Sequence, residues 1–442
     1  MKNTFIIGRS PIYIFGFLLV LQSMALQAQN LTSDEAVRIA LKNSLGIQLA
    51  RNNVDIATIY NSYGIAGGLP FVTANASDQE QSPSIKQEYA DPANNKKSNN
   101  AFSNNLSAQV NGSMLLYNGQ RVVTAKKRLG MIEAQTRQQL SSRALVLATN
   151  VLLKYYDVVR QQSYAKVLQA SIEAQKQQLA IVQAQQSVGL ANNADLFQSQ
   201  VDLNTQIQNL QAQLLIIDQG KTDLLTLLTL KPDSTIMIQD TILVDRNIQL
   251  ATILSGVQSV NPDIIAANEQ ITINQYIEKE TGAQRYPSLS VNAGYTYSRT
   301  RNTQGFSLLN LNYGPYAAIS LNVPIFNGNV YKKQQQVAGV NIRNAQLVRD
   351  TLLLGYTATA VKNFQAYTSN LQQVETARAN YDLSQKLLDL VVQKFKLKQA
   401  TIVEVTNARQ SFENAGFLLT NVSYAAKAAE ITLKRYANQL TY

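Results

Sequence analysis

The chain has 442 residues, of which 45% are hydrophobic and 15% are charged, with a formal net charge of +11. It contains no cysteine, histidine or tryptophan, which excludes disulfides and thiolate or histidine catalysis and disfavours a dedicated soft-metal site. The basic residues are scattered, which does not favour nucleic-acid binding, and no nucleophile elbow, phosphate loop or metal-ligand cluster indicates an enzyme or a cofactor.

The N-terminus is typical of a secretory signal peptide over residues 1–28. Two basic residues precede a short apolar run at 12–21, and small residues follow. Cleavage after Ala25 and cleavage after Ala28 both fit this pattern. No later segment reaches 18 consecutive apolar residues, so we expect an exported protein without a membrane helix.

The mature chain is predicted to begin a first structural repeat, residues 29–230, that alternates helices and strands. Its expected helices are 31–66, 120–188 and 192–230, and its expected strands are 70–77 and 106–117. A polar stretch at 78–104 is predicted to be a long loop.

A linker at 231–250 leads to a second predicted repeat, residues 251–442. Its expected helices are 251–283, 329–398 and 401–438, and its expected strands are 287–298 and 315–326. The longest helices would be rods of roughly 100 Å at about 1.5 Å per residue.

The two halves repeat one pattern at a fixed offset. The pair Asn327-Gly328 lies 209 residues after Asn118-Gly119, and Glu404 lies 209 residues after Asp195. Both Asn-Gly pairs follow a hydrophobic run and precede a long helical segment, so we expect strand-to-helix turns there.

The predicted strands alternate apolar and polar residues. In residues 288–297 the sequence SLSVNAGYTY places Leu289, Val291 and Tyr295 on one face, with Ser290 and Asn292 on the other. A period of two is typical of a half-buried strand, and also of a membrane barrel strand with its apolar face outward.

The shorter helices carry heptads that predict coiled-coil packing. The first copy has leucine or isoleucine every seven residues from Leu196 to Leu224, with Ile207 and Leu214 in a second seam. The second copy repeats this seam in phase from Val405 to Leu433.

Four membrane strands cannot close a barrel alone, so the interpretation of these strands as part of a membrane barrel requires oligomerisation. Two copies give a narrow eight-stranded barrel and three give twelve strands with a pore, which favours three without forcing it. The alternative is a soluble periplasmic coiled-coil protein of the cell envelope, which explains the helices but not the four alternating strands.

The chain resembles the TolC-like outer membrane efflux proteins. The resemblance rests on SDEAVRIALKNS (33–44), the LP and YP strand starts, LLYNG and VPIFNG, SVGLANNADLFQSQ (187–200) and KLKQATIVEVTNA (396–408), in this order and spacing. It covers essentially the whole mature chain.

This resemblance implies a mainly α protein with membrane β-strands, assembled as a homotrimer. A 12-strand β-barrel in the outer membrane of a Gram-negative bacterium would continue into a long α-helical barrel in the periplasm. Its function would be an exit duct for tripartite efflux or type I secretion, gated at its periplasmic end by a periplasmic adaptor and, indirectly, an inner-membrane pump.

The resemblance also assigns roles to the two helix-turn-helix tips. Contact with the adaptor is implied for Val188, Gly189 and Leu190, and for Lys398, Gln399 and Ala400. Ala400 stands where relatives carry a gate arginine, and Gly189 is equally explained as a helix C-cap.

By the same resemblance, Glu404 occupies the position of a tunnel-constriction acid. Asn407 occupies a second such position that is often acidic, so a weaker ring of charge is expected. Asp195 and Phe395 match positions that tie helices together in the closed state. Helix-dipole stabilisation of the two acids, and ordinary packing of Phe395, are the simpler alternatives.

Overall fold

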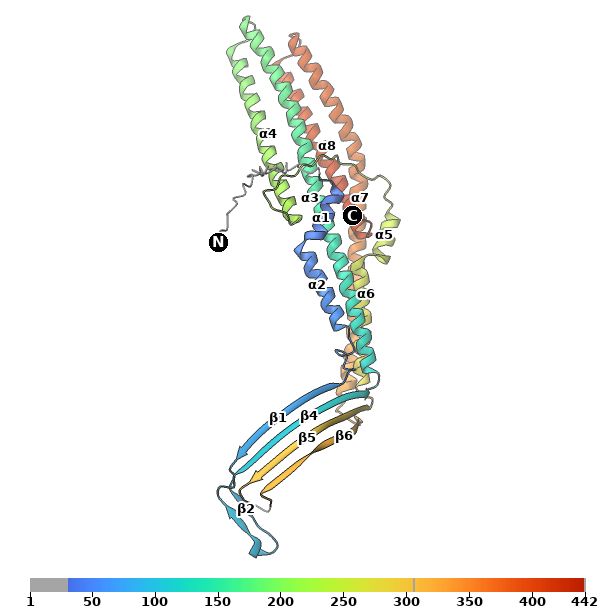
Figure 1. Ribbon diagram of the computed structural model, residues 1–442. Helices are drawn as coiled ribbons and strands as arrows, with labels where there is room; N and C mark the ends of the chain where they lie inside the picture. The colour runs from blue at the N-terminus through green and yellow to red at the C-terminus, as the bar shows by residue number, and fades with distance from the viewer. Residues whose placement is uncertain (1–30, 305–306, 441–442) are drawn as a thin grey trace, which may run out of the picture.

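The computed structural model describes residues 31–304 and 307–440, so the predicted signal peptide lies outside the described residues. A curved sheet occupies one end of the molecule and long helices lead away from it to two helical hairpins at the other end (Figure 1). No helix in the described ranges is both long and apolar enough to cross a membrane.

The main sheet has four antiparallel strands in the order β1-β4-β5-β6. They are β1 (Phe71–Gln81), β4 (Ser103–Tyr117), β5 (Ser288–Asn302) and β6 (Leu309–Asn322). The central pairing joins the two repeats, because β4 of the first lies against β5 of the second, as in Val110 opposite Tyr295. Strands β1 and β6 are the two edges.

The register gives the sheet one apolar and one polar face. On the apolar face, Val291 lies opposite Ile319 and Tyr297 opposite Tyr313. On the polar face, Asn292 donates a hydrogen bond to Ser320 (3.3 Å). Tyr316 also lies on the polar face, where its hydroxyl accepts from Gln109 and donates to Asn111, both at 2.8 Å.

The strands of the sheet extend further than predicted at their outer end, where β1 reaches Gln81, β4 begins at Ser103 and β5 reaches Asn302. The strand expected at 315–326 begins at Leu309 and ends at Asn322, because β5 starts at Ser288 and offers no partner beyond it, and Pro324 has no N–H for a ladder. The predicted loop at 78–104 contains a small hairpin, β2 (Ile85–Gln87) with β3 (Lys96–Ser98), joined through the 3₁₀ turn Pro92–Asn94.

The long helices reproduce the offset of 209 residues at both ends. Helices α3 (Arg121–Ser187) and α7 (Val330–Lys396) each have 67 residues, and α4 (Asn193–Leu227) and α8 (Ile402–Tyr436) each have 35. Thr229 and Asn438, which follow the shorter helices, both adopt a left-handed conformation. The fold is therefore a tandem strand-strand-helix-helix repeat.

The main leucine heptad of α4 is buried in part: Ile217 and Leu224 are buried, and Leu196, Leu203 and Leu210 are half-buried. Ile207 and Leu214 of the second predicted seam are exposed on the single chain. A further buried seven-residue series is small and polar, and consists of Ser199, Gln206, Gln213 and Gly220. Gln213 bonds both the backbone and the side chain of Gln161 on α3. The leucine stripe thus flanks the α3–α4 contact, and its outer members face away from the protomer.

The helix predicted at the start of each repeat is in fact a pair of helices. The segment expected at 31–66 divides into α1 (Ser33–Asn43) and α2 (Leu45–Tyr60), since Ser44 ends one helix and caps the next. The segment expected at 251–283 divides into α5 (Leu250–Ser259) and α6 (Pro262–Ala283). Asn261 caps α6 and Pro262 fixes its first turn, which is a common helix start.

The linker between the repeats is tied to α8 by a buried carboxylate. Glu430, 3% exposed, accepts from the Asp245 backbone N–H (3.0 Å) and pairs with Lys427 and Lys434, both at 3.0 Å. The Asn247 N–H and Lys434 lower the pKa of Asp245. These contacts hold the linker around the middle of the helical region.

The protomer is an open wall with two unlike edges. Beside the sheet the helices follow the order α2-α3-α6-α7, and towards the tips the order α4-α3-α8-α7. One edge therefore consists of β1, α2 and α4, and the other of β6 and α7. Both edges are apolar, with Leu49 (64% exposed) and Val201 (58%) on the first and Leu354 (71%) on the second.

Gly416 of α8 lies in tight contact with Val167 of α3, whereas Gly355 of α7 has open space beside it. We predict that alanine has opposite effects on stability at these two positions. A Cβ at Gly416 would lie 2.6 Å from Val167 Cγ1, whereas nothing lies within 4 Å of one at Gly355 on α7. Alanine gains about 1 kcal/mol of helix propensity, but overpacking costs about 1–3 kcal/mol.

We therefore expect Gly416→Ala to lower the melting temperature of the dissociated single chain and Gly355→Ala to raise it, measured by helical circular dichroism. Equal stabilisation by both substitutions would contradict tight α3–α8 packing.

Candidate functional site

The two Asn-Gly turns join the sheet to the long helices. Asn118 and Asn327 accept the first backbone bonds of α3 and α7, each at 3.3 Å. Gly119 (φ 64°) is held there by contact as well as by conformation, because a Cβ would lie 2.8 Å from the Tyr286 side chain. The residues that follow, Gln120 and Asn329, are left-handed too, so both long helices leave the sheet in the same way.

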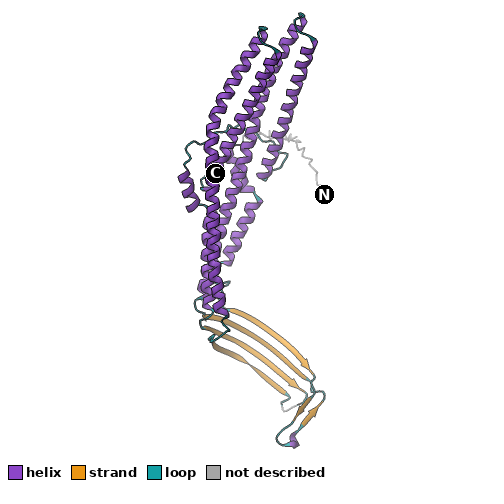
Figure 2. Ribbon diagram, turned by 180° about the vertical axis from the view of Figure 1, so that it is seen from behind, coloured by secondary structure: helices purple, strands orange, loops and turns teal. Residues whose placement is uncertain are grey.

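The tip of the first hairpin lies at the far end of the molecule from the sheet (Figure 2). Val188 ends α3, Gly189 turns with φ 74°, and the Leu190 N–H donates to the Gln185 carbonyl at 2.8 Å. Val188 and Leu190 are 66% and 60% exposed. Gly189 therefore serves as a helix C-cap between two outward apolar side chains.

The second tip repeats this backbone without glycine. Lys398, at the position of Gly189, has φ 63°, and the Gln399 N–H donates to the Lys394 carbonyl at 2.8 Å. A left-handed lysine costs about 1–2 kcal/mol relative to a right-handed one. Ala400 packs against the hydrophobic cluster between α7 and α8, so it is the inward residue of this tip.

Glu404 closes the start of α8 by a capping box. Its carboxylate accepts from the Thr401 N–H (2.6 Å) and hydroxyl (3.0 Å), while its own N–H donates to Thr401 Oγ1 (3.2 Å). These bonds lower the pKa of Glu404. The side chain is exposed on the protomer and remains ionised at neutral pH.

Asp195 holds the equivalent place at the start of α4 with a different use of its side chain. The N-cap here is Asn192, whose Oδ1 accepts from the Asp195 N–H at 2.8 Å. The Asp195 carboxylate makes no hydrogen bond within the described residues. The two acids thus share backbone position but not capping role.

Of the remaining gate candidates, Asn407 is exposed and Phe395 is buried. Asn407, one turn beyond Glu404, is exposed. Phe395, 6% exposed, lies in a hydrophobic cluster of α3, α7 and α8, together with Val392, Val405 and Phe412. Phe395 is therefore a packing residue within the protomer, whereas Asn407 lies on the same helix end as Glu404.

A buried ionic cluster, which was not expected from the sequence, joins three helices nearby. Arg409 of α8, 5% exposed, bonds Glu413 one turn on at 2.5 Å. Ser171 of α3 donates to the same carboxylate, and the Gln206 amide of α4 lies against both charges, 3.2 Å from Glu413. The available signal was a charged residue inside the apolar stripe of Val405, Ala408 and Phe412.

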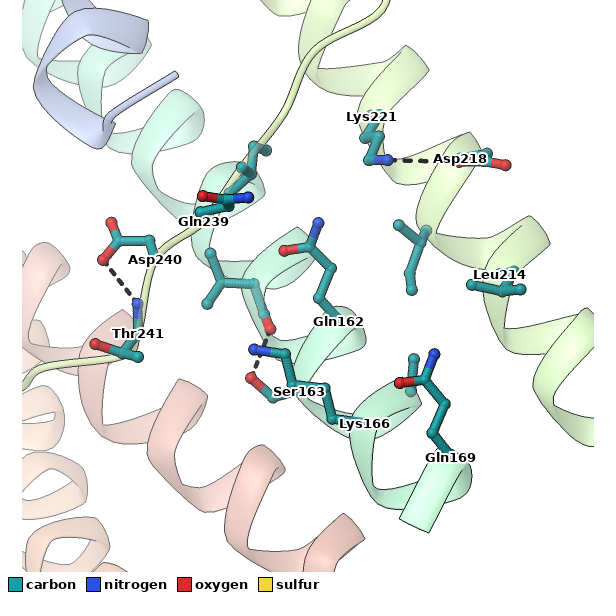
Figure 3. A pocket seen from close by; sticks show the side chains of 14 residues that line it. Gln162, Ser163, Lys166, Gln169, Leu214, Asp218, Lys221, Gln239, Asp240 and Thr241 are labelled. Carbon is teal, nitrogen blue, oxygen red and sulfur yellow. Dashed lines mark hydrogen bonds and ion pairs between the residues drawn. The ribbon is translucent and has the colours of Figure 1, made fainter. Parts of the chain in front are cut away.

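A groove of about 650 Å³ lies where the linker crosses α3 and α4 (Figure 3). Its lining is mainly amide and charged side chains, with Asp218 and Lys221 paired at 3.6 Å. It contains none of the tip or gate residues singled out from the sequence, although Leu214 and Ile217 of the predicted heptad seams line it. The described residues also hold no group of three or more metal-ligating side chains.

The ionic cluster is expected to carry a large part of the contact between the two hairpins. Removing one partner of a buried pair costs about 3–5 kcal/mol, whereas an apolar replacement of both is often near neutral. We predict that Glu413→Gln lowers the thermal stability strongly and that Arg409→Met with Glu413→Leu lowers it less.

The control is Glu375→Gln, which breaks the exposed Arg246–Glu375 pair and should cost less than about 1 kcal/mol. Equal melting temperatures for the Glu413 and Glu375 variants would show that the buried cluster contributes nothing.

The second repeat carries a known sequence signature. Residues 253–439 match the family model described as outer membrane efflux protein. No curated protein matches the chain. The sequence-based resemblance to TolC-like proteins is therefore confirmed over this part of the chain.

Solved structures agree over most of the chain. The Campylobacter jejuni CmeC outer membrane channel superposes with a TM-score of 0.72 at 17% identity, covering 92% of this chain and 85% of that one. The Vibrio cholerae outer membrane protein VceC gives 0.73 at 14%, covering 92% and 95%. The open-state Neisseria gonorrhoeae MtrE channel gives 0.69 at 15%, covering 92% and 88%. The chain therefore shares the fold of these outer membrane channels.

Proposed function

We propose that this chain, whose fold and second repeat are those of the outer membrane efflux protein family, is one subunit of a passive exit duct across the outer membrane and periplasm. The observation that carries the proposal is the open wall. A four-stranded sheet with one apolar and one polar face continues into helices that leave the same two edges unpartnered.

Closure with further copies satisfies both edges at once. Strand β6 of one copy would pair with β1 of the next, and α7 would pack against α2 and α4 of that neighbour. Unpaired strand edges cannot face lipid, because each unbonded backbone group costs several kcal/mol there. Three copies give twelve strands and a pore, with the apolar sheet face outward.

In this arrangement the hairpin tips form the periplasmic end. Exposed Val188 and Leu190, with Lys398 and Gln399, would meet an adaptor that links the duct to an inner-membrane pump. The conduit itself would be passive in efflux or type I secretion, and its gate would open when the tips move apart. The buried Arg409–Glu413 cluster would hold the two hairpins together in either state.

The assembly is tested by the native mass of protein extracted from outer membranes in detergent. We expect the mass of three chains. In planar bilayers we expect ion conductance when the extracted protein is present and none when it is absent. A soluble monomer or dimer that is absent from the outer membrane would contradict the duct and favour the interpretation as a periplasmic coiled-coil protein.

The charge at the tunnel mouth is tested by Glu404→Gln. Glutamine keeps the capping box but removes the charge, so folding should persist while the cation-to-anion permeability ratio falls several-fold. Wild-type selectivity should weaken only at a pH below 4.5, the ordinary value from which the pKa is lowered. The matched control is Asp233→Asn in the linker. Unchanged selectivity in the Glu404 variant would remove this residue from the pore.

A further inference from the structure

We propose that Arg299 and Arg301 form a binding site for the phosphate groups of outer-leaflet lipid. The inference rests on the proposed duct, because it needs the apolar face of the sheet to meet the membrane. It is carried by the strand register, the height of the two arginines along β5, and the absence of a charged partner.

The register places both arginines on the lipid face of the sheet. Residues 289, 291, 293, 295 and 297 of β5 lie on the apolar face, and Arg299 and Arg301 continue the same alternation. Their partners on β6 are Leu311 and Leu309, which are also apolar. An arginine on this face points towards lipid, whereas the polar face carries the residues that line the lumen.

Their height matches the headgroup layer. From Leu289 to Tyr297 the strand rises about 27 Å, or about 20 Å along the membrane normal at the usual tilt, close to the apolar band of a membrane barrel. Tyr297 and Tyr313 lie opposite each other at the far end of this band, as interfacial aromatic residues do. Arg299 lies about 5 Å beyond them and Arg301 about 10 Å beyond.

This end of the sheet is the outer one. The helices leave the sheet at the opposite end, so in the proposed duct they extend into the periplasm and the arginines face the cell exterior (Figure 1). The lipid headgroups at that level belong to the outer leaflet. Arginine suits their phosphates because its guanidinium offers several donors in a fixed fork.

Neither arginine is neutralised within the described residues. Arg299 is half-buried, and its Nε has no acceptor although water does not reach it. Its Nη2 donates to Asn104 Oδ1 at 3.2 Å. Arg301 is exposed, and neither residue forms an ion pair with any part of the chain that the structure describes.

The carboxylates on this face lie two strands away. Asp78 and Glu80 of β1 are level with Arg299 and Arg301, with β4 in between. Two strand spacings are about 10 Å, so these acids do not replace a direct partner. Asp78 reaches Arg299 only through Asn104, whose amide donates to Asp78 at 2.7 Å.

The test measures binding of diphosphoryl lipid A to the detergent-purified full chain, with fully dephosphorylated lipid A as the comparison probe. Each membrane-surface arginine changes affinity about fivefold. Arg299→Gln with Arg301→Gln should therefore lower affinity for the phosphorylated probe about 25-fold, and leave the dephosphorylated probe unaffected. Arg378→Gln, on α7 and far from the sheet, is the control.

Equal affinity of wild type and double variant would overturn the site. Displacement by an equal concentration of inorganic phosphate would also overturn it, in favour of a free-anion site. If the glutamine variant fails to assemble, two other measurements test the site. They are the affinity of the Arg299→Lys, Arg301→Lys variant for the phosphorylated probe and the salt dependence of wild-type binding. Affinity for the phosphorylated probe must then fall with salt, and indifference to salt counts against the site.

The same preparations separate this inference from the duct itself. A conducting trimer from the outer membrane that binds phosphorylated lipid without the arginines would refute the lipid site alone. Failure to find any outer-membrane trimer would refute the proposed function, and the lipid site with it.

Discussion

In the proposed duct, the rest of the structure depends on one constraint, that a sheet edge facing lipid must find a partner. Strands β1 and β6 end the sheet with unpaired backbone groups, and the hydrocarbon of a membrane offers them none. The helices also need partners along these two edges, because α2, α4 and α7 expose apolar side chains there. Since the edges differ from each other, the contact between copies in the proposed duct would be head-to-tail, and it would close only as a ring.

Within the protomer, the long helices of the two repeats are equal in length and unequal in environment. Helices α3 and α7 match residue for residue at their ends, yet α3 lies between α4 and α8 and buries much of its length, whereas α7 borders an open edge. The centre is accordingly held by specific contacts, with Gly416 against Val167 and the charges of Arg409 and Glu413 shared with Ser171 and Gln206. The edge carries plain aliphatic residues, which suit a surface completed by another copy.

The repeat and its element types could be predicted from the sequence, because an offset of 209 residues relates Asn118 to Asn327 and every long helix to its counterpart. Helix breaks at Ser44 and Asn261 were missed, since each needs only one capping residue inside a helical pattern. The Arg409 cluster could not be predicted, because it unites α3, α4 and α8, segments up to about 240 residues apart. The buried polar series of α4, and the exposure of Ile207 and Leu214, were missed for a related reason. The leucines of α4 signal burial, but the sequence does not say whether the protomer or a neighbouring copy covers them.

At the tips, capping and charge are not competing explanations for the two acids. Thr401 holds the Glu404 carboxylate in place and keeps it ionised, so a structural role also fixes the position of a negative charge. Asn192 takes over capping in the first repeat, which leaves the Asp195 carboxylate without a fixed orientation. Charges that are already oriented act on passing ions without the cost of ordering them first. In the proposed duct, Glu404 is therefore the better placed of the two acids to form a symmetric ring, because the capping box fixes its carboxylate.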